Sequence, residues 1–290
     1  MIIHMPRPRR QAAASRHYNA RMPKVRLDVL LVERGLADSR AQARALIMAG
    51  KVLREGQPES RAGLQVDPKS ILEVQQGPRF VSRGGEKLEA ALIAFDLEVK
   101  GLVCADVGAS TGGFTDCLLQ RGAARVYALD VGKGLLHWKL RQDPRVVVME
   151  QTNARFVEGL PEPVSLVTID ASFISLRLLL PVVKRWLTSD ELAARGILTL
   201  IKPQFEAGRQ DVRRGKGVIR DPRLHRHILL EVLTSAQDEG LRARRLLRSP
   251  LLGPKGNVEF LAWLAPAAGR APDLAALIEQ ACAAPAQLEK

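Results

Sequence analysis

The chain has no apolar run long enough to cross a membrane as a helix, which takes about 18 residues or more. Its most apolar stretch, "LRLLLPVVKRWL", is too short and carries Arg177, Lys184 and Arg185. The first residues show neither the apolar core nor the cleavage signal of a secretory leader. We therefore expect no spanning segment, no membrane partner and no secretion.

Cysteine is also scarce. The 290 residues include three, and these show neither paired nor metal-ligand spacing: Cys104, Cys117 and Cys282. This predicts reduced thiols in the cytoplasm and no metal site.

Acidic residues are too few to balance the basic ones, since 44 Lys and Arg face 31 Asp and Glu, a formal net charge of +13. Residues 1–26 alone contain seven Lys or Arg and no acidic residue. Such a charge favours a polyanionic partner, with nucleic acid the first candidate and an anionic membrane surface the second. We predict a disordered basic arm over residues 1–23; the alternative is that translation begins at Met22.

A small module follows, over residues 24–78. The run "RLDVLLVERGLADSRAQARALIMAGKVLREG" has apolar residues at helical spacing, with Ser39 as an N-cap, and leads into short strands. This order of two helices and a small sheet resembles the S4 RNA-binding domain, an α+β fold. The resemblance implies that basic side chains of this module contact phosphates of structured RNA, namely Arg26, Arg40, Arg44 and Lys51. The alternative is a solvated helix face.

A connector at 79–82 leads to a larger domain, 83–266, that begins with a strand, a glycine loop and a helix ("GLVCADVGASTGGFTDCLLQRGA"). The loop has no lysine for a triphosphate. The next strand ends at Asp130, 22 residues after Gly108, where an acid suits the hydroxyl pair of a ribose. Together these features point to S-adenosylmethionine more than to NAD. The predicted cofactor residues here are Asp106, Gly108, Ser110, Gly112, Gly113, Phe114 and Asp130. Singly, Asp130 would be a strand-end cap and Asp106 a carboxylate that braces the loop.

Strands and helices then alternate to the end of this domain, which predicts an α/β fold with a doubly wound sheet. Ligands on such sheets gather at the carboxyl ends of the strands. Asp106, Asp130, Asp170 and Lys202 all sit at such ends. We expect Asp170 and Lys202 to face each other over one crevice beside the cofactor.

Two further polar residues are unusually placed: Glu259 interrupts the apolar run "NVEFLAWL", and Lys87 follows a glycine pair in "SRGGEKLEAAL". A Lys–Asp–Lys–Glu set is typical of ribose 2′-O-methyltransferases of the FtsJ/RrmJ type. With the S4 module and the motifs "DPRVVVMEQTNAR", "DASFISL", "KPQFEAGR" and "GPKGNVEFLAWL", the chain resembles the TlyA family over roughly residues 24–264. That family comprises ribosomal RNA (cytidine-2′-O)-methyltransferases, also named haemolysins.

The resemblance implies a Rossmann-like class I methyltransferase that uses S-adenosylmethionine and acts on RNA of the 30S subunit, the 50S subunit or both. It implies that Lys202 acts as the base or orients the hydroxyl, and that Asp170 holds it near the methyl group and the cofactor. Lys87 and Glu259 complete the catalytic set, and Asn153 contacts the adenine side of the cofactor. A lysine base requires a lowered pKa, which burial or a second ammonium provides.

Each of these residues also has a structural interpretation. Lys87, between Glu86 and Glu89, suits a solvated helix face; Glu259 suits an edge-strand guard, and Asp170 a turn cap. The loop "EAGRQDVRRGKGVIRD" is either an exposed surface loop or an RNA clamp that becomes ordered on binding. The RNA-binding set of this domain is Arg83, Arg209, Arg213, Arg214 and Lys216.

Two other functions compete with the enzyme: a membrane-lytic protein, as the haemolysin name suggests, and an RNA-binding protein with an inactive methyltransferase fold. The missing spanning segment argues against the first, and the intact glycine loop with its four-residue set argues against the second. Residues 267–290 are predicted to form a peripheral tail.

Overall fold

The structure, a computed structural model, describes residues 23–75, 77–190, 194–266 and 272–283. The chain divides into two compact units, Met1–Gly77 and Pro78–Lys290, which we call unit 1 and unit 2. The predicted basic arm lies outside the described residues except for Pro23, and so does half of the predicted tail, residues 267–271 and 284–290.

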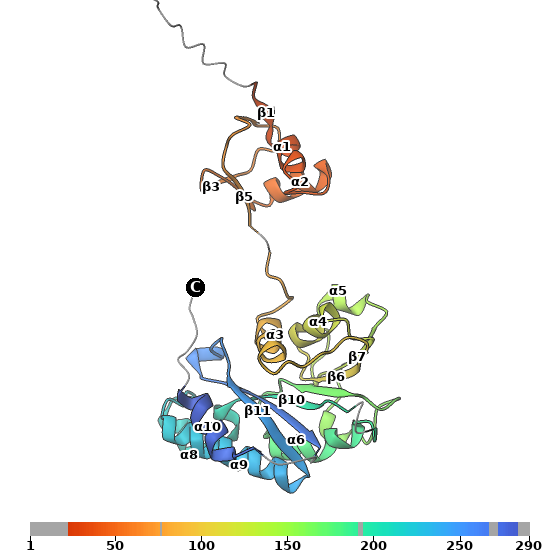
Figure 1. The fold of residues 1–290 in the computed structure, drawn as a ribbon, viewed down its shortest axis with the longest axis vertical. Coiled ribbons are helices and arrows are strands. Elements are labelled where there is room, and N and C mark those ends of the chain that lie inside the picture. The colour runs from red at the N-terminus through yellow and green to blue at the C-terminus, as the bar shows by residue number, and fades with distance from the viewer. Residues whose placement is uncertain (1–22, 76, 191–193, 267–271, 284–290) are drawn as a thin grey trace, which may run out of the picture. The chain divides into compact units, whose positions relative to one another are not determined.

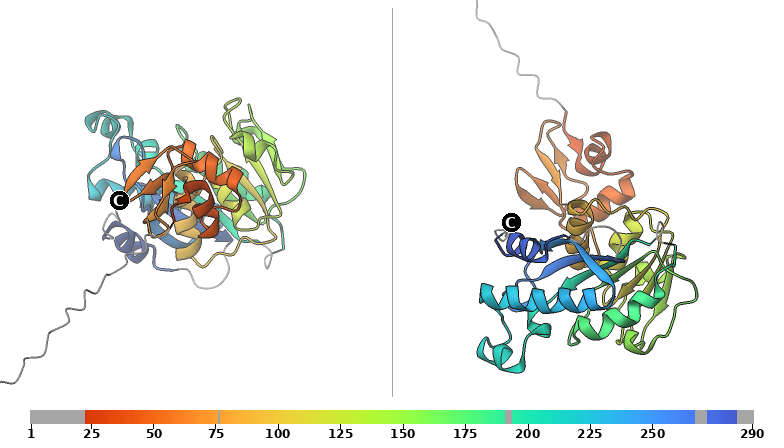
Figure 2. Two further views of the ribbon diagram at one scale, coloured as in Figure 1. Left: turned by 90° about the horizontal axis from the view of Figure 1, so that it is seen from above. Right: turned by 60° about the horizontal axis from the view of Figure 1, so that its bottom comes forward.

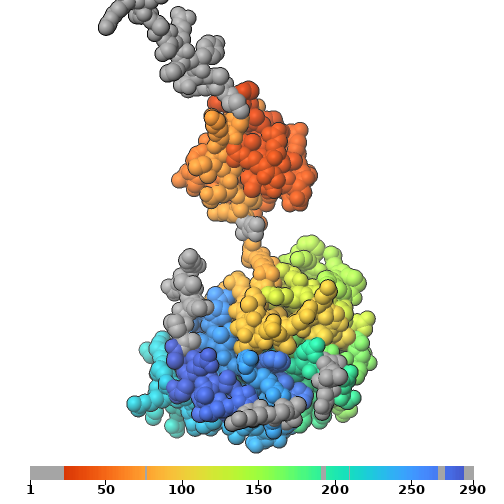
Figure 3. Space-filling view, viewed as in Figure 1, coloured from red at the N-terminus to blue at the C-terminus, as the bar shows by residue number. Residues whose placement is uncertain are grey.

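Unit 1 is a small α+β body built on two helices, α1 (Leu27–Glu33) and α2 (Arg40–Met48). The Ser39 hydroxyl caps α2 by accepting from Gln42 N at 3.2 Å, as its position predicts. The strands are β1 (Val25–Arg26), β2 (Val52–Arg54), β3 (Gln57–Glu59), β4 (Gln65–Val66) and β5 (Leu72–Val74). They form a three-stranded sheet, β3-β2-β5, and a separate β1-β4 pair. In Figure 3 this unit, coloured red to orange, packs as one small body.

Unit 2 is an α/β body around a seven-stranded sheet of order β11-β12-β10-β9-β6-β7-β8. Five neighbouring strands are parallel, and β12 pairs antiparallel with both β10 and β11. The strands are β6 (Val103–Val107), β7 (Arg125–Leu129), β8 (Val146–Met149), β9 (Leu166–Ile169), β10 (Gly196–Ile201), β11 (Leu241–Arg248) and β12 (Phe260–Pro266). The predicted doubly wound fold is thereby confirmed, with an antiparallel strand pair at one edge.

Helices cover both faces of this sheet (Figure 1). On one face, α3 (Gly84–Ala94) packs beside α4 (Gly113–Gln120). On the other face lie α6 (Leu176–Val183), α9 (Pro222–Asp238) and α10 (Leu274–Ala283), and Figure 2 shows α6 and α9 crossing below the strands. The short helices are α5 (Trp138–Arg141), α7 (Pro203–Glu206) and α8 (Arg209–Arg214), and 3₁₀ turns cover Ala154–Phe156, Lys184–Trp186 and Pro254–Gly256. Each face has its own apolar core, because central strands such as β10 bury side chains on both sides.

The sheet order creates a switch point between β6 and β9. From β6 the chain proceeds to β7 and β8 on one side, and then returns to β9 and β10 on the other. Loops leaving the carboxyl ends of β6 and β9 therefore diverge, which leaves a crevice above the strands.

Three local expectations differ from the structure. Glu259 precedes β12 rather than interrupting it. Residues 209–214, expected to be ordered only on binding, form helix α8. Residues 274–283, assigned to a peripheral tail, form α10, which packs on α9 and buries Ile278 and Ala281. Among the described residues, no helix combines the length and apolar character needed to cross a membrane.

Candidate active site

The glycine loop after β6 is shaped by a close approach to the loop after β9. Gly108 has φ +84°, and a Cβ there would lie 2.8 Å from the carbonyl oxygen of Asp170. Gly112 has φ +99° and is the N-cap residue of α4. A larger residue would strain the backbone at either position, and at Gly108 it would also collide with the loop after β9.

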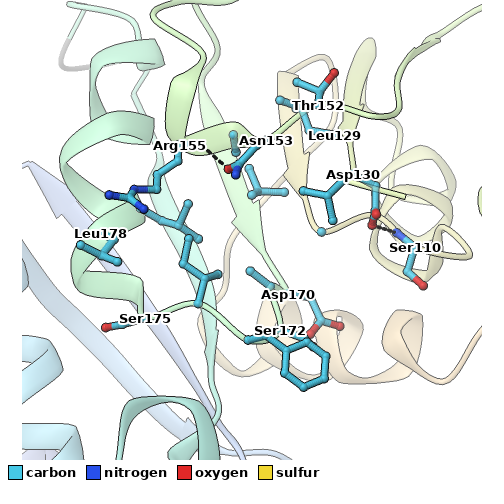
Figure 4. Close-up of a pocket in the computed structure, with 18 of the residues that line it drawn as sticks. Ser110, Leu129, Asp130, Thr152, Asn153, Arg155, Asp170, Ser172, Ser175 and Leu178 are labelled. Atoms are coloured by element: carbon cyan, nitrogen blue, oxygen red, sulfur yellow. Dashed lines mark hydrogen bonds between the residues drawn. The ribbon is translucent and has the colours of Figure 1, made fainter. Parts of the chain in front are cut away.

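The first cavity lies over this loop and has a volume of about 690 Å³. In Figure 4, Asp130 and Ser110 form one side of it, Arg155 and Leu178 the other, and Asp170 lies between. Asp130 braces its own side, because its carboxylate accepts from Ser110 N at 2.8 Å and from Gly132 N at 2.7 Å. The remaining wall includes apolar side chains of Val131, Leu135, Ile174 and Leu179.

Among the predicted cofactor residues, Gly108, Ser110, Asp130, Asn153 and Asp170 line this cavity. Gly113 and Phe114 instead line a neighbouring cavity, and Gly112 lines neither.

Asp106 also lies apart from both cavities, fully buried beneath the loop. It accepts hydrogen bonds from Thr115 Oγ1 at 2.7 Å and Thr168 Oγ1 at 3.1 Å. Burial raises the pKa of Asp106 to about 7, and the hydrogen bonds from the two threonine hydroxyls offset this only in part. Asp106 therefore braces the loop against β9 and α4, in line with its structural interpretation.

The second cavity, of about 520 Å³, adjoins the first and shares its lining at Gly108, Ser110, Asp170 and Ser172. Lys87 and Lys202 both line it, together with Ser82, Arg83 and Thr111. The two cavities are thus separated only by the glycine loop and the residues that follow β9.

Each of these lysines is paired with one carboxylate. Lys202 Nζ lies 2.6 Å from Asp170 Oδ1 and donates to Ser172 Oγ at 2.9 Å. Lys87 Nζ lies 2.6 Å from Glu259 Oε2, with side chains 10% and 0% exposed. The predicted Lys202–Asp170 pairing is present, and the structure adds the Lys87–Glu259 pair. Lys87 is buried, so it does not lie on a solvated helix face.

The geometry of the Lys87–Glu259 pair depends on Gly253. A Cβ at Gly253 would lie 2.0 Å from Glu259 Oε1, so only glycine leaves room for this carboxylate. In the described part of the chain, no three His, Cys, Asp or Glu side chains come together as metal ligands do.

The comparisons with known proteins agree with this geometry. Residues 80–265 match the model of the FtsJ-like methyltransferase family, and residues 25–72 match that of the S4 domain. The chain is 48% identical over 245 residues to a protein of Mycobacterium tuberculosis (strain H37Rv) named 16S/23S rRNA (cytidine-2′-O)-methyltransferase TlyA, covering 83% of this chain and 90% of that one. This chain belongs to the TlyA family of FtsJ-like methyltransferases.

Two further relatives match over most of their length. Hemolysin A of Brachyspira hyodysenteriae is 42% identical over 244 residues, which cover 82% of this chain and 98% of that one. A solved structure from Streptococcus thermophilus, also named as a hemolysin, is 42% identical with a TM-score of 0.64, covering 90% of this chain and 96% of that one. As a member of the family, the protein is an enzyme of the methyltransferase class.

The predicted RNA-binding arginines of unit 1 converge on a carboxylate that the sequence reasoning missed. Asp28 is fully buried and lies 3.0 Å from Arg26 Nε, 3.2 Å from Arg40 Nη2 and 3.0 Å from Arg44 Nε. These guanidinium groups hold the pKa of Asp28 far below its usual range. The arginine side chains stay 40–54% exposed, so the cluster presents a surplus of positive charge. Lys51 follows the end of α2 and is half-buried.

In unit 2, the predicted RNA-binding residues lie at two places. Arg83 lines the second cavity, and its guanidinium donates to Leu252 O at 3.2 Å. Arg209, Arg213 and Arg214 belong to α8, and Lys216 follows it. The side chains of Arg213, Arg214 and Lys216 are exposed.

Three residues around the cavities escaped the sequence reasoning. Ser172 holds Lys202, and Phe173 is 91% exposed at the rim of the first cavity with φ +64°. Glu206 is buried, which raises its pKa, and it accepts from Ser175 Oγ and Leu176 N at the start of α6. The rule that binding residues follow strand ends would have pointed to Ser172 and Phe173.

Proposed function

We propose that the protein transfers the methyl group of S-adenosylmethionine to the 2′-hydroxyl of a cytidine ribose in ribosomal RNA. One observation carries this proposal: the two cavities share a wall, and both lysines line the second. A methyl donor in the first cavity and a ribose in the second would meet at that wall. The name of the M. tuberculosis relative supports the same substrate class.

The first cavity fits the proposed cofactor. Its volume lies within the usual range for small-molecule sites, and its apolar walls surround a few polar groups. Of the residues that line it, Asp130 would hold the ribose of S-adenosylmethionine and Asn153 its adenine side. Asp170 would hold the methionine side. When bound, S-adenosylmethionine would supply an electrophilic methyl group on its sulfonium.

The chain's own residues would position the acceptor. Lys202 is fixed by Asp170 and Ser172 at once, so its ammonium can donate to the ribose hydroxyl oxygen in one orientation. Lys87, fixed by Glu259, provides a second cation on the same cavity. Lys202 would thus orient the hydroxyl oxygen, and the proton that this oxygen loses on taking the methyl group would pass to water.

We further propose that the S4-like domain, residues 24–78, binds structured RNA of the 30S subunit, the 50S subunit or both. Its arginine cluster around Asp28 has three cations for one carboxylate and would position phosphates without reading sequence. We also propose that residues 79–82 are the connector and that the methyltransferase domain spans residues 83–266.

The test is transfer of tritiated methyl from S-adenosylmethionine onto purified 30S and 50S subunits, followed by nuclease mapping. Label on a ribose, seen as resistance of the adjacent bond to alkaline cleavage, is the expected result. Cofactor binding without label on either subunit or on naked ribosomal RNA would contradict the substrate assignment and leave the fold unaffected.

A further inference from the structure

Two exposed lysines of unit 2 occupy neighbouring turns and have no acidic partner among the described residues. Lys216 follows α8, and Lys255 lies in the 3₁₀ turn Pro254–Gly256. In contrast, Lys87, Lys184 and Lys202 each form an ion pair with a carboxylate at 2.6 Å. The positive charge of the two turns is therefore available to a ligand.

The two turns are far apart in sequence but adjacent in space. A Cβ built on Gly217 would lie 3.8 Å from Lys255 Nζ, so this ammonium lies over the residue that follows Lys216. Two ammonium groups held on adjacent turns repel each other unless an anion lies between them.

A single buried side chain, Asn257, joins the turns and is only 2% exposed. Its Nδ2 donates to Gly217 O at 3.0 Å and to Pro254 O at 3.1 Å, and its Oδ1 accepts from Ile219 N at 3.1 Å. Both ends of the amide are therefore satisfied, and the spacing of the turns is fixed.

In each turn the lysine has a left-handed backbone conformation, which is unfavourable for a residue with a side chain. Lys216 has φ +51° and Lys255 has φ +58°, each followed by a glycine with positive φ. A residue with a Cβ in this region costs about 1–2 kcal/mol relative to the right-handed region. The fixed turns thus set the direction in which both lysine side chains leave the backbone.

The Lys255 turn is connected to the second cavity on both sides. Before it, Leu252 O accepts from Arg83, which lines that cavity. After it, Glu259 holds Lys87, which lines the cavity too. The Lys255 turn thus lies between two chain positions that contact residues of the second cavity, so an RNA whose ribose enters the cavity can extend to this turn.

We propose that Lys216 and Lys255 together bind a phosphodiester group of the substrate RNA, flanking the ribose to be methylated. Asn257 is the positioning residue that sets the spacing of the two turns that carry these lysines. This inference rests on the proposed RNA substrate and adds a specific phosphate contact to it.

The test is methyl-transfer kinetics on ribosomal RNA at several salt concentrations with Lys216→Gln, Lys255→Gln and the double variant. Each substitution is expected to raise KM for RNA about fivefold and to lower the salt dependence of binding by about one ion, because one phosphate contact is lost. The kcat and the dissociation constant for S-adenosylmethionine should not change. Lys100→Gln is the matched control, since Lys100 is exposed at the opposite end of β6. A double variant with the KM and salt dependence of this control would overturn the proposal.

Asn257→Asp separates a positioning role from a merely structural one. It keeps an acceptor for Ile219 N but loses both donations to the turns. The expected result is the KM defect of the lysine variants, with little further loss when the changes are combined. A lower melting temperature with unchanged KM for RNA would remove Asn257 from the proposal.

Filter binding of a ribosomal RNA fragment, without the methyl donor, distinguishes the two failures. Weaker binding by the double variant, with no methyl transfer by the wild type, would support the phosphate site and contradict the proposed reaction. Transfer by the wild type with equal binding by the double variant would contradict the phosphate site alone.

Discussion

Asp28 in unit 1 and Asp106 in unit 2 are both completely buried, but their partners differ. Asp28 faces three guanidinium groups, and its pKa is lowered; Asp106 faces two threonine hydroxyls, and its pKa is raised to about 7. Glu259 is also buried, and its one cationic partner is Lys87. Burial alone penalises a carboxylate, so the number of cations beside it decides its charge and its role. The arginine cluster around Asp28 has surplus positive charge, which suits contact with a polyanion. The lysine–carboxylate pairs are balanced in charge, which suits orientation of a substrate. Asp106, which has no cationic partner among the described residues, suits a structural role beneath the glycine loop.

The largest effect is expected where a matched pair faces the second cavity. Lys202→Ala removes the ammonium that Asp170 and Ser172 hold, and should lower the rate of methyl transfer by about 10²–10⁴-fold. Cofactor binding, measured by calorimetry, should persist. A near wild-type rate on RNA would contradict the role given to Lys202.

The arginine cluster of unit 1 depends on one carboxylate, that of Asp28. Asp28→Asn leaves three half-exposed arginines without their common partner and should lower the free energy of unfolding of unit 1 by about 2–3 kcal/mol. Hydrogen exchange of the α1 amides in the full chain would report this change. Glu33→Gln, at an exposed position of the same helix, should have no such effect. Equal protection in the two variants would show that the arginine cluster does not stabilise the unit.

The raised pKa of Asp106 predicts that its contribution to stability falls as the pH rises, whereas the contribution of Asp28 falls as the pH is lowered. Because the pKa of Asp106 is raised when folded, the folded state holds the proton more tightly than the unfolded state. Its contribution to stability is complete below about pH 4 and declines as the pH rises to about 7. Asp106→Asn should abolish that decline in denaturant melts of unit 2 within the full chain. Parallel pH profiles for the variant and the wild type would contradict the raised pKa.

The smallest effect should come from crowding the Lys87–Glu259 pair. In Gly253→Ala the new methyl would collide with Glu259 Oε1 and displace it from Lys87, lowering kcat by about tenfold, which corresponds to 1.4 kcal/mol. Gly159→Ala is the control, because a Cβ there meets nothing within 4 Å. If both variants have wild-type kcat, the position of Glu259 does not matter to the reaction.

Sequence patterns predicted much of the fold because they are local. The apolar run 196–201 is a fully buried strand, and Ser39 caps α2, as expected. Helix α10 was missed because its Ala-rich sequence has weak periodicity, and its helical form is stabilised by packing against α9.

For the candidate site, the sequence indicated which residues lie at strand ends but not their partners. It predicted that Asp170 and Lys202 would meet, since parallel strands end at one edge. It did not predict that Lys87 would reach Glu259, because the two are 172 residues apart and lie outside the strands. Asp28 was missed for a related reason: two of its arginine partners, Arg40 and Arg44, lie on another helix, α2.

The amino-acid sequence by itself determined the two-part organisation, the α/β class and the family, because periodicity, capping residues and motif order are properties of short segments. Only the tertiary structure decided which charges are matched, which are in surplus and which are unpaired. That decision depends on where the chain brings distant side chains within about 3 Å of each other, and burial then makes each such pairing energetically decisive.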